Sequence, residues 1–183
     1  FENDEGPRRD ASLEALAKLK PAFRNDGRVT AGNSSSLNDG AAALVVASRA
    51  YAESRGLTPL ARIVAYGQAA LESKWLFAAP AKAMPKVLAR AGWTFADVDL
   101  IELNEAFAAQ VLANGYELAD QGWDWNKVNV YGGGISLGHP IGASGARVLT
   151  TLIHALRDRG LKRGLASLCL GGGEAVALAV EVE

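Results

Sequence analysis

The sequence has one cysteine, no long apolar run and almost no net charge, and each of these features excludes a class of protein. One cysteine among 183 residues cannot form an internal disulfide, which fits a reducing compartment, so we expect a cytoplasmic protein. A net charge of −1 gives no electrostatic reason to expect nucleic acid or an anionic membrane as a partner. No apolar stretch reaches the ~20 residues of a membrane-spanning helix. One cysteine and two histidines also lack the ligand spacing of a zinc site, and we expect no metal.

The start of the chain lacks a methionine. The sequence begins with Phe1 and continues through a polar stretch, residues 2–10. No folded domain needs to begin there, and we therefore expect the chain to be a piece of a longer protein.

Hydrophobic spacing predicts two helices before residue 59. Apolar residues at 13, 16, 17 and 19 indicate a short helix that stops at Pro21. A second helix is predicted over about 40–55, with Asn38 or Asp39 as its N-cap and Gly56 at its end.

Strands and helices alternate after Pro59, which is typical of an α/β fold. The predicted strands are 62–66, 99–103, 128–131, 165–170 and 175–182, and the predicted helices are 81–91, 105–121 and 143–159. The last strand is nearly all small and apolar, as expected of a strand buried on both faces. The order β-α-β-α-β-α-β-β implies a mixed, five-stranded sheet with helices on both faces.

His139 is the first candidate for chemistry. It lies in Gly138-His-Pro-Ile-Gly-Ala-Ser-Gly145, among glycines that allow a ligand or another backbone to approach closely. It also precedes a predicted helix, whose N-terminus lowers the pKa of an imidazole and keeps the ring neutral and able to accept a proton. By contrast, His154 shares a helix face with polar residues, and we interpret it as a surface residue.

Cys169 is the second candidate. Free cysteine often behaves as a small buried hydrophobe. Here a leucine and three glycines follow it, and their backbone N–H groups can stabilise a thiolate or a developing oxyanion. Combined with His139, this context favours a functional thiol.

Two polar segments are weaker candidates. Asn104 can cap the helix predicted from residue 105, or its amide at a strand end can hold a water that donates to an oxyanion. Ser34-Ser35-Ser36 is either a solvated loop or a hydrogen-bonding partner for an amide-containing substrate arm.

Other interpretations of these residues are open. The run Gly132-Gly-Gly134 faintly resembles a dinucleotide-binding turn, but Cys169 stands where the acidic residue of that motif is expected. Asn104, His139 and Cys169 are also the residue types of a cysteine hydrolase with Cys169 as nucleophile, and spacing alone does not exclude one. A non-catalytic scaffold is a further alternative, although scaffolding requires none of the three.

Seven motifs follow one another along the chain. They are residues 4–8, 13–23, 29–33 and 37–42, Asn104-Glu-Ala-Phe-Ala-Ala109, Gly138–Arg147 and Cys169-Leu-Gly-Gly-Gly173. In this order they resemble the C-terminal half of the thiolases, the family of acetyl-CoA acetyltransferases and 3-ketoacyl-CoA thiolases. The last three motifs are highly specific in combination.

The resemblance implies a fold and an activity. The expected fold is a thiolase-type αβαβαββ domain. The expected activity is acyl transfer in fatty acid metabolism, by Claisen condensation of acetyl-CoA or thiolytic cleavage of a short 3-ketoacyl-CoA such as acetoacetyl-CoA. Coenzyme A is then a substrate or product, and no permanently bound cofactor is expected. The expected partners are acyl-CoA substrates and further copies in a homodimer or homotetramer.

The resemblance also implies roles for four catalytic residues. An acyl-CoA acylates a cysteine whose proton His139 takes, and Cys169 then acts as acid and base on the α-carbon of a second acetyl-CoA. His139 and a water held by Asn104 would line one oxyanion hole, and the backbone N–H of Gly171 would help to form the other. Further matches fall on positions that line the pantetheine tunnel or lie near the nucleotide end of CoA: Phe23, Ala31, Ser35, Leu37 and Phe107 for the tunnel, and Arg8 for the nucleotide.

The chain also departs from the family. The acyl-accepting cysteine belongs to the N-terminal half, and this chain has no second cysteine. We therefore expect it to supply the acid/base half of the site and to be inactive without the half that carries the nucleophile. Glu174 stands where an uncharged residue is common, and a carboxylate so close to Cys169 is expected to raise its pKa.

The resemblance predicts three regions. Residues 1–39 correspond to a remnant of the thiolase loop domain, 40–58 to a helix belonging to the N-terminal domain, and 59–183 to the C-terminal domain.

Overall fold

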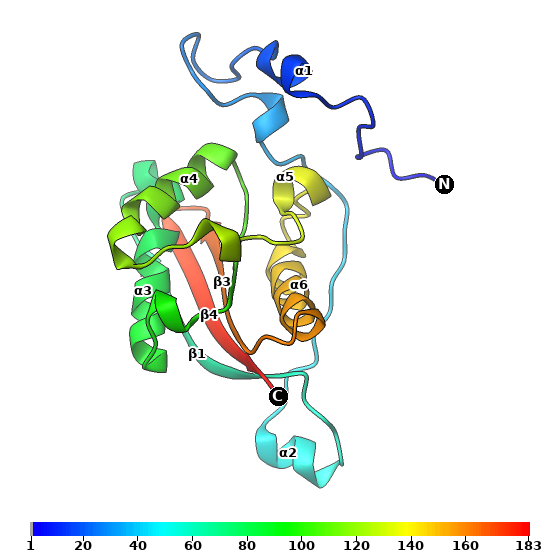
Figure 1. Ribbon diagram of the computed structural model, residues 1–183, viewed down its shortest axis with the longest axis vertical. Helices are drawn as coiled ribbons and strands as arrows, with labels where there is room; N and C mark the ends of the chain where they lie inside the picture. The colour runs from blue at the N-terminus through cyan, green and yellow to red at the C-terminus, as the bar shows by residue number, and fades with distance from the viewer. Residues whose placement is uncertain (1) are drawn as a thin grey trace.

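The structure is a computed structural model that describes residues 2–183. It has three layers, with a four-stranded mixed sheet between two helical layers (Figure 1). The strand order is β1 (Ala61–Ala70), β4 (Glu174–Val182), β3 (Arg163–Leu170) and β2 (Leu100–Leu103). The pair β2–β3 is parallel, and the pairs β3–β4 and β1–β4 are antiparallel. The predicted α/β class with a mixed sheet is confirmed.

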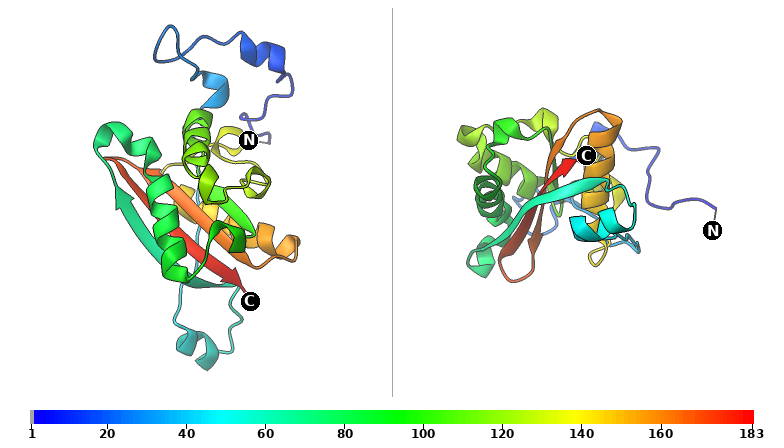
Figure 2. Two further views of the ribbon diagram at one scale, coloured as in Figure 1. Left: turned by 60° about the vertical axis from the view of Figure 1, so that its left-hand side comes forward. Right: turned by 90° about the horizontal axis from the view of Figure 1, so that it is seen from below.

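Helices cover the two faces of the sheet unequally (Figure 2). On one side lie α3 (Pro80–Ala91) and α4 (Ala108–Glu117), and on the other lies α6 (Ser144–Asp158). The remaining α-helices are short: α1 (Leu13–Ala17), α2 (Arg49–Ser54) and α5 (Gly134–Leu137). Single 3-10 turns occupy Ala31–Asn33, Ser73–Ala78, Phe95–Asp97, Ala119–Gln121 and Trp125–Lys127. In residues 2–183 we find no helix with the length and hydrophobicity that a membrane crossing requires.

Two apolar cores hold the layers together because alternate residues of a strand point to opposite faces. In β2, Ile101 and Leu103 pack on the α3 side, whereas Leu100 packs on the α6 side. The α6 core is completed by Val148 and Leu152, both fully buried. The face of β2 that carries Leu100 therefore looks towards α6, which matters for the residues that follow it.

The predicted fifth strand at 128–131 does not form. Within residues 2–183 this segment makes only isolated bridges, including a parallel one between Val128 and Ile101. Asn129 adopts a left-handed φ of 47°, and its side chain occupies the edge of β2. The segment lies where a fifth strand would pair but is too short and too sharply turned to extend the ladder.

The second predicted helix is much shorter than expected. The prediction covered about 40–55, but the helix α2 spans only Arg49–Ser54. Residues 40–48 have no helical structure, and Val45 is 96% exposed. A helix takes most of its stability from the surface against which it packs, and residues 40–48 bury no side chain in this chain, although 43–48 line a cavity with Leu149 and Ile153 of α6.

The composition of β4 predicted a strand buried on both faces, but the structure buries only one face along its whole length. Ala175, Ala177 and Ala179 are buried on the α3 side. On the other face Val176 is exposed, because α6 lies over β2 and β3 and leaves the β1–β4 side open. This open face is lined by apolar residues and bounded by α6.

Candidate active site

Three side chains form a hydrogen-bonded chain at the end of β2. Asn104 follows the strand directly, and its Nδ2 lies 3.4 Å from Nε2 of His139. On the other side of the ring, Nδ1 of His139 lies 2.6 Å from Oγ of Ser144, the first residue of α6. The predicted histidine and asparagine thus meet, and a serine that the sequence analysis did not single out completes the chain.

The partners of Ser144 determine which nitrogen of His139 carries the proton. Its hydroxyl donates to the carbonyl of Pro140 at 2.9 Å, so its oxygen accepts from Nδ1–H of His139. Nε2 is then the unprotonated nitrogen, and the Nδ2 group of Asn104 points a donor towards its lone pair. The ring is arranged as a neutral base with the basic nitrogen on the Asn104 side.

The pKa of His139 is lowered, in the predicted direction. Burial is the main cause, and the positive charge of Arg147 on α6 is the second. The predicted cause was the dipole of a helix directly after His139, but α6 begins only at Ser144. His154, the surface residue of the sequence analysis, is exposed on the outer side of α6.

Asn104 is buried and does not cap a helix. It is 2% exposed, and its backbone N–H donates to the carbonyl of Ser167 on β3 at 3.0 Å. The helix predicted from residue 105 begins at Ala108. Within residues 2–183, Oδ1 of Asn104 is buried with no hydrogen-bond partner. One acceptor at the site is therefore available for a hydrogen bond from a water or a ligand.

Cys169 lies on β3, two residues beyond Ser167 and next to the end of β2. Because β2 and β3 are parallel, their carboxyl ends reach the same edge of the sheet, where Asn104 is also located. Burial raises the pKa of the Cys169 thiol. The sequence analysis gave two opposing effects, backbone donors and the carboxylate of Glu174; a backbone hydrogen bond does lower the pKa, but burial outweighs it and Glu174 is not among the causes. The thiol is therefore protonated at neutral pH.

The glycines after Cys169 form the turn between β3 and β4. Gly171 is exposed in this turn, and Gly172 and Gly173 follow with φ of 94° and 112°, which only glycine adopts readily. The turn is fixed from outside by Ser73, whose Oγ donates to the carbonyl of Gly172 at 2.9 Å.

An extended segment before α2 lies across the site. Ser35 donates to the carbonyl of Ala106 through both its backbone N–H, at 3.1 Å, and its Oγ, at 3.0 Å. The backbone N–H of His139 donates to the carbonyl of Ser36 at 3.0 Å, and Leu37 forms a bridge with His139. The segment thus joins the loops that carry Asn104 and His139.

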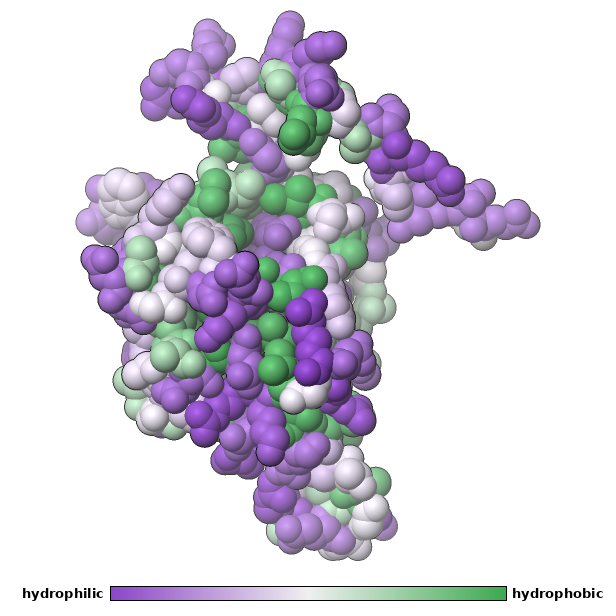
Figure 3. Space-filling model, viewed as in Figure 1, coloured by the Kyte–Doolittle hydropathy of each residue, from purple (hydrophilic) through white to green (hydrophobic). Residues whose placement is uncertain are grey.

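Three aromatic rings pack against one another close to this segment. Phe107 makes edge-to-face contacts with Phe23, at 5.9 Å between centroids, and with Phe77, at 5.2 Å. Ala31 lies in the adjacent 3-10 turn, and the N-terminal segment projects from the body with exposed apolar side chains (Figure 3). Arg8 belongs to that segment and is exposed.

Two further residues hold the site, and the sequence analysis missed them. Asn129 accepts from the N–H of Leu103 at 2.9 Å and donates to the carbonyl of Leu103 at 2.8 Å. It also donates to Glu105 Oε1 at 2.9 Å, and the other carboxylate oxygen of Glu105 accepts from the N–H of Ile135. A side chain at Gly133 would collide with Glu105, so this glycine is required by close packing. No local sequence pattern indicates this contact, because Glu105 and Gly133 lie 28 positions apart along the chain.

No group of three or more histidine, cysteine, aspartate and glutamate side chains within residues 2–183 is arranged to hold a metal ion.

Comparison with known proteins gives a consistent result. The family model described as "Thiolase, C-terminal domain" matches residues 57–182, and "Thiolase, N-terminal domain" matches residues 1–50. The acetyl-CoA acetyltransferase of Pseudomonas aeruginosa is 57% identical over 97% of this chain and 44% of its own length. That of Allochromatium vinosum is 54% identical over 99% of this chain and 45% of its own length.

Solved structures agree. The crystal structure of the Bacillus anthracis acetyl-CoA acetyltransferase matches with a TM-score of 0.94 and 54% identity, over 98% of this chain and 45% of that one. Human mitochondrial 3-ketoacyl-CoA thiolase in complex with CoA matches with a TM-score of 0.87 and 39% identity, over 98% and 45%. The chain thus spans slightly less than half the length of these proteins.

Proposed function

This chain belongs to the thiolase family, and on that premise we propose that it is the acid/base half of an acyl-CoA C-acyltransferase. The reaction is condensation of two acetyl-CoA molecules or cleavage of a short 3-ketoacyl-CoA by coenzyme A. The observation that carries the proposal is the chain Asn104–His139–Ser144, at the same edge of the sheet as Cys169. It combines a neutral base with a protonated thiol, which is what proton transfer to and from a thioester requires.

His139 is the base that activates the attacking thiol. Its Nε2 is unprotonated and its lowered pKa keeps it so at neutral pH. A thiolate, not a thiol, is the nucleophile in acyl transfer. The activated thiol belongs to the other half of the protein, because the thiol of Cys169 is the only one in this chain.

Once protonated, His139 serves a second purpose. Nε2–H becomes a donor next to Asn104, whose free Oδ1 can accept from a water that directs its other proton to the same point. Two such donors stabilise the oxygen of a thioester enolate as its charge develops. The N–H of Gly171, in the turn after Cys169, is the donor we assign to the second oxyanion hole.

Cys169 moves the proton at the α-carbon. A thiol kept protonated by burial is a poor resting nucleophile but a suitable acid for the departing enolate of acetyl-CoA. This argues against a cysteine hydrolase that uses Cys169 for attack. The tunnel for the pantetheine arm is assigned to Phe23, Ala31, Ser35, Leu37 and Phe107, and the nucleotide end to Arg8.

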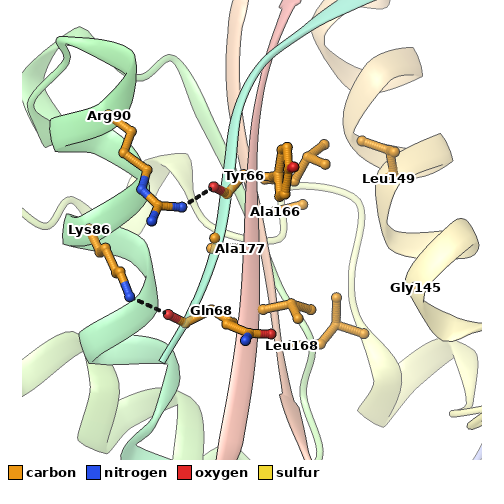
Figure 4. Close-up of a pocket in the computed structure, with 12 residues that line it drawn as sticks. Tyr66, Gln68, Lys86, Arg90, Gly145, Leu149, Ala166, Leu168 and Ala177 are labelled. Carbon is orange, nitrogen blue, oxygen red and sulfur yellow. Dashed lines mark hydrogen bonds between the residues drawn. The ribbon is translucent and has the colours of Figure 1, made fainter. Parts of the chain in front are cut away.

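The open face of the sheet is where we place the other half of the protein. A groove of about 590 Å³ runs between β1, β4 and α6, and its walls include Leu149, Leu168 and Leu178 (Figure 4). Contiguous apolar surface of this kind is a mark of an interface. We assign residues 40–58 to the same missing domain, since residues 43–48 stay exposed beside α6 in this chain.

The test is an assay of the full-length protein that contains this chain. We expect CoA-dependent cleavage of acetoacetyl-CoA, and a loss of about 10²-fold or more in kcat for His139→Ala and for Cys169→Ala. His154→Ala is the matched control and keeps full activity. Inactivity of the wild type with 3-ketoacyl-CoA of every chain length would overturn the proposal.

A second experiment tests whether the acyl group is carried by Cys169 or by another cysteine of the full-length protein. The full-length protein is incubated with radiolabelled acetyl-CoA and digested, and we expect stable label on a cysteine outside residues 1–183. Label on Cys169 would mean that this thiol is the nucleophile and that the protein is a hydrolase.

A further inference from the structure

A second polar pair joins β2 to α6, one step away from the catalytic chain. Glu102 lies two residues before Asn104, so both side chains belong to the face of β2 that looks towards α6. Arg147 lies one turn after Ser144 on the sheet-facing side of α6. Nη1 of Arg147 is 3.5 Å from Oε2 of Glu102. The strand and the helix are therefore connected twice, once through His139 and once through this pair.

The pair is badly placed for stability. Glu102 is 2% exposed, and its contact with Arg147 is single and long. Within residues 2–183, Oε1 of Glu102 and Nε of Arg147 are both buried without a hydrogen-bond partner. Burial raises the pKa of Glu102 to about 7, even though Arg147 lowers it. A buried, incompletely paired carboxylate costs free energy, and such groups cluster where function requires them.

The charge of Arg147 acts on the catalytic ring. It lowers the pKa of His139, second only to burial. The other titratable groups near the ring are Glu102 and Glu105 from the end of β2 and Cys169 from β3. Glu105 is occupied by Asn129 and Ile135, and Cys169 is a neutral thiol. Glu102 is therefore the carboxylate that contacts Arg147, and Arg147 lies one turn along α6 from Ser144, the hydrogen-bond partner of Nδ1 of His139.

We propose that Arg147 is a positioning residue for the thiolase reaction: through Glu102 it ties α6, which carries Ser144, to the strand that leads into Asn104, and so holds the two hydrogen-bond partners of His139 in place. The inference rests on the proposed function for its kinetic consequence. Its structural part, an arginine on α6 paired with a carboxylate on β2 beside the hydrogen-bond partners of His139, stands apart from the identity of the substrate.

The test measures the ionisation of His139 directly. In full-length protein labelled with ¹⁵N in histidine, the His139 signals are assigned by their loss in His139→Asn and followed through a pH titration. Arg147→Met is expected to raise the pKa of His139 by about 0.5–1 unit. The acid limb of the kcat profile is expected to move up by the same amount, with KM for acetoacetyl-CoA changed less than about twofold.

The controls separate charge from packing. Arg147→Lys keeps the cation and is expected to hold the pKa of His139 within about 0.2 unit of the wild type. Arg157→Met removes the same side chain from an exposed position of the same helix and is expected to shift nothing. Arg147→Gln replaces Arg147→Met if the latter does not fold.

The inference is overturned if the neutral variants leave the titration of His139 unchanged, or if Arg147→Lys shifts it as far as they do. Absence of thiolase activity in the wild type would refute the proposed function instead, and the ring titration would still be measurable.

Discussion

At the scale of residues, the chemistry depends on how the neighbours of a ring fix its proton. Ser144 can accept from Nδ1 of His139 because its own proton is already donated to Pro140. The basic nitrogen is thus directed at Asn104, and within residues 2–183 no carboxylate is hydrogen-bonded to the ring. The type of residue at 139 indicated a base, but the tautomer follows only from the geometry.

Removal of the hydroxyl of Ser144 should therefore impair the base. In Ser144→Ala of the full-length protein, Nδ1–H has no acceptor, and we expect kcat to fall about tenfold, the equivalent of one lost hydrogen bond. Steady-state kinetics with acetoacetyl-CoA provide the measurement. Ser136→Ala, whose hydroxyl contacts only the carbonyl of Gly133, is the control, and equal rates for the two variants would contradict the expectation.

A second prediction concerns Glu102 and stability. Its pKa of about 7 in the folded protein lies above the ordinary value of 4.5. The stability that comes from the protonated form is thus complete below pH 4.5 and lost as pH rises through 7. Glu102→Gln stays neutral, so its free energy of unfolding relative to the wild type should increase between pH 5 and 8, by an amount on the order of 2–3 kcal/mol.

Urea unfolding of both proteins at the two pH values measures this difference. Glu117→Gln, which removes one partner of the exposed pair with Lys82, should show the same difference at both pH values. A difference for Glu102→Gln that is constant with pH would refute the prediction.

At the scale of elements, the alternation of strands and helices after Pro59 was predictable, and its one failure is instructive. The segment 128–131 has the apolar residues of a strand, and it does lie beside β2. Its pairing with β2 ends at Asn129, whose side chain makes hydrogen bonds with both the backbone N–H and the carbonyl of Leu103. An asparagine whose side chain makes the hydrogen bonds of a neighbouring strand cannot be distinguished in sequence from an asparagine in an ordinary turn.

Asn129 should therefore be more important than its half-buried position suggests. Asn129→Ala removes three hydrogen bonds and puts alanine at a left-handed φ, and we expect a loss of stability of about 2–4 kcal/mol. Asn129→Gly relieves the backbone strain and should recover about 1 kcal/mol of this. Asn126→Ala is the control, because this asparagine bonds only within its own turn. Equal melting temperatures for the variants at 126 and 129 would contradict the role assigned to Asn129.

At the scale of the whole molecule, the layers are incomplete. One face of the sheet is covered by α3, whereas α6 covers only part of the other. The outer edge of β1 is better protected from pairing with another strand than the open face is from solvent. Lys86 and Arg90 donate hydrogen bonds to the carbonyls of Gln68 and Tyr66 on this edge (Figure 4). Protection of the edge but not of the face points to a partner that covers the face.

A pair of tyrosines tests this arrangement. Tyr66 lines the open groove and Tyr116 lies on α4, and each is 72% exposed in this chain. If the missing half covers the groove, Tyr66→Thr should lower the melting temperature of the full-length protein by several degrees, since burial of an aromatic ring contributes roughly 1.5–3 kcal/mol. Tyr116→Thr should change it little. Similar shifts for both variants would mean that the groove is open to solvent.

The sequence by itself determined the fold class and most of the elements, and it predicted His139, Cys169 and Asn104 as site residues, because periodicity and residue type are local properties. It also indicated the lowered pKa of His139, but for the pKa of Cys169 it indicated opposing effects, from backbone donors that stabilise a thiolate and from the carboxylate of Glu174. The tertiary structure alone decided the rest. It made burial the main cause of the pKa shifts of His139 and Cys169, and it fixed the proton on Nδ1 of His139. It also formed the hydrogen bonds of Asn129 to Leu103 and Glu105 and the pair Glu102–Arg147. These features depend on contacts between residues 5 to 45 positions apart, and such distances close only when strand, turn and helix have packed together.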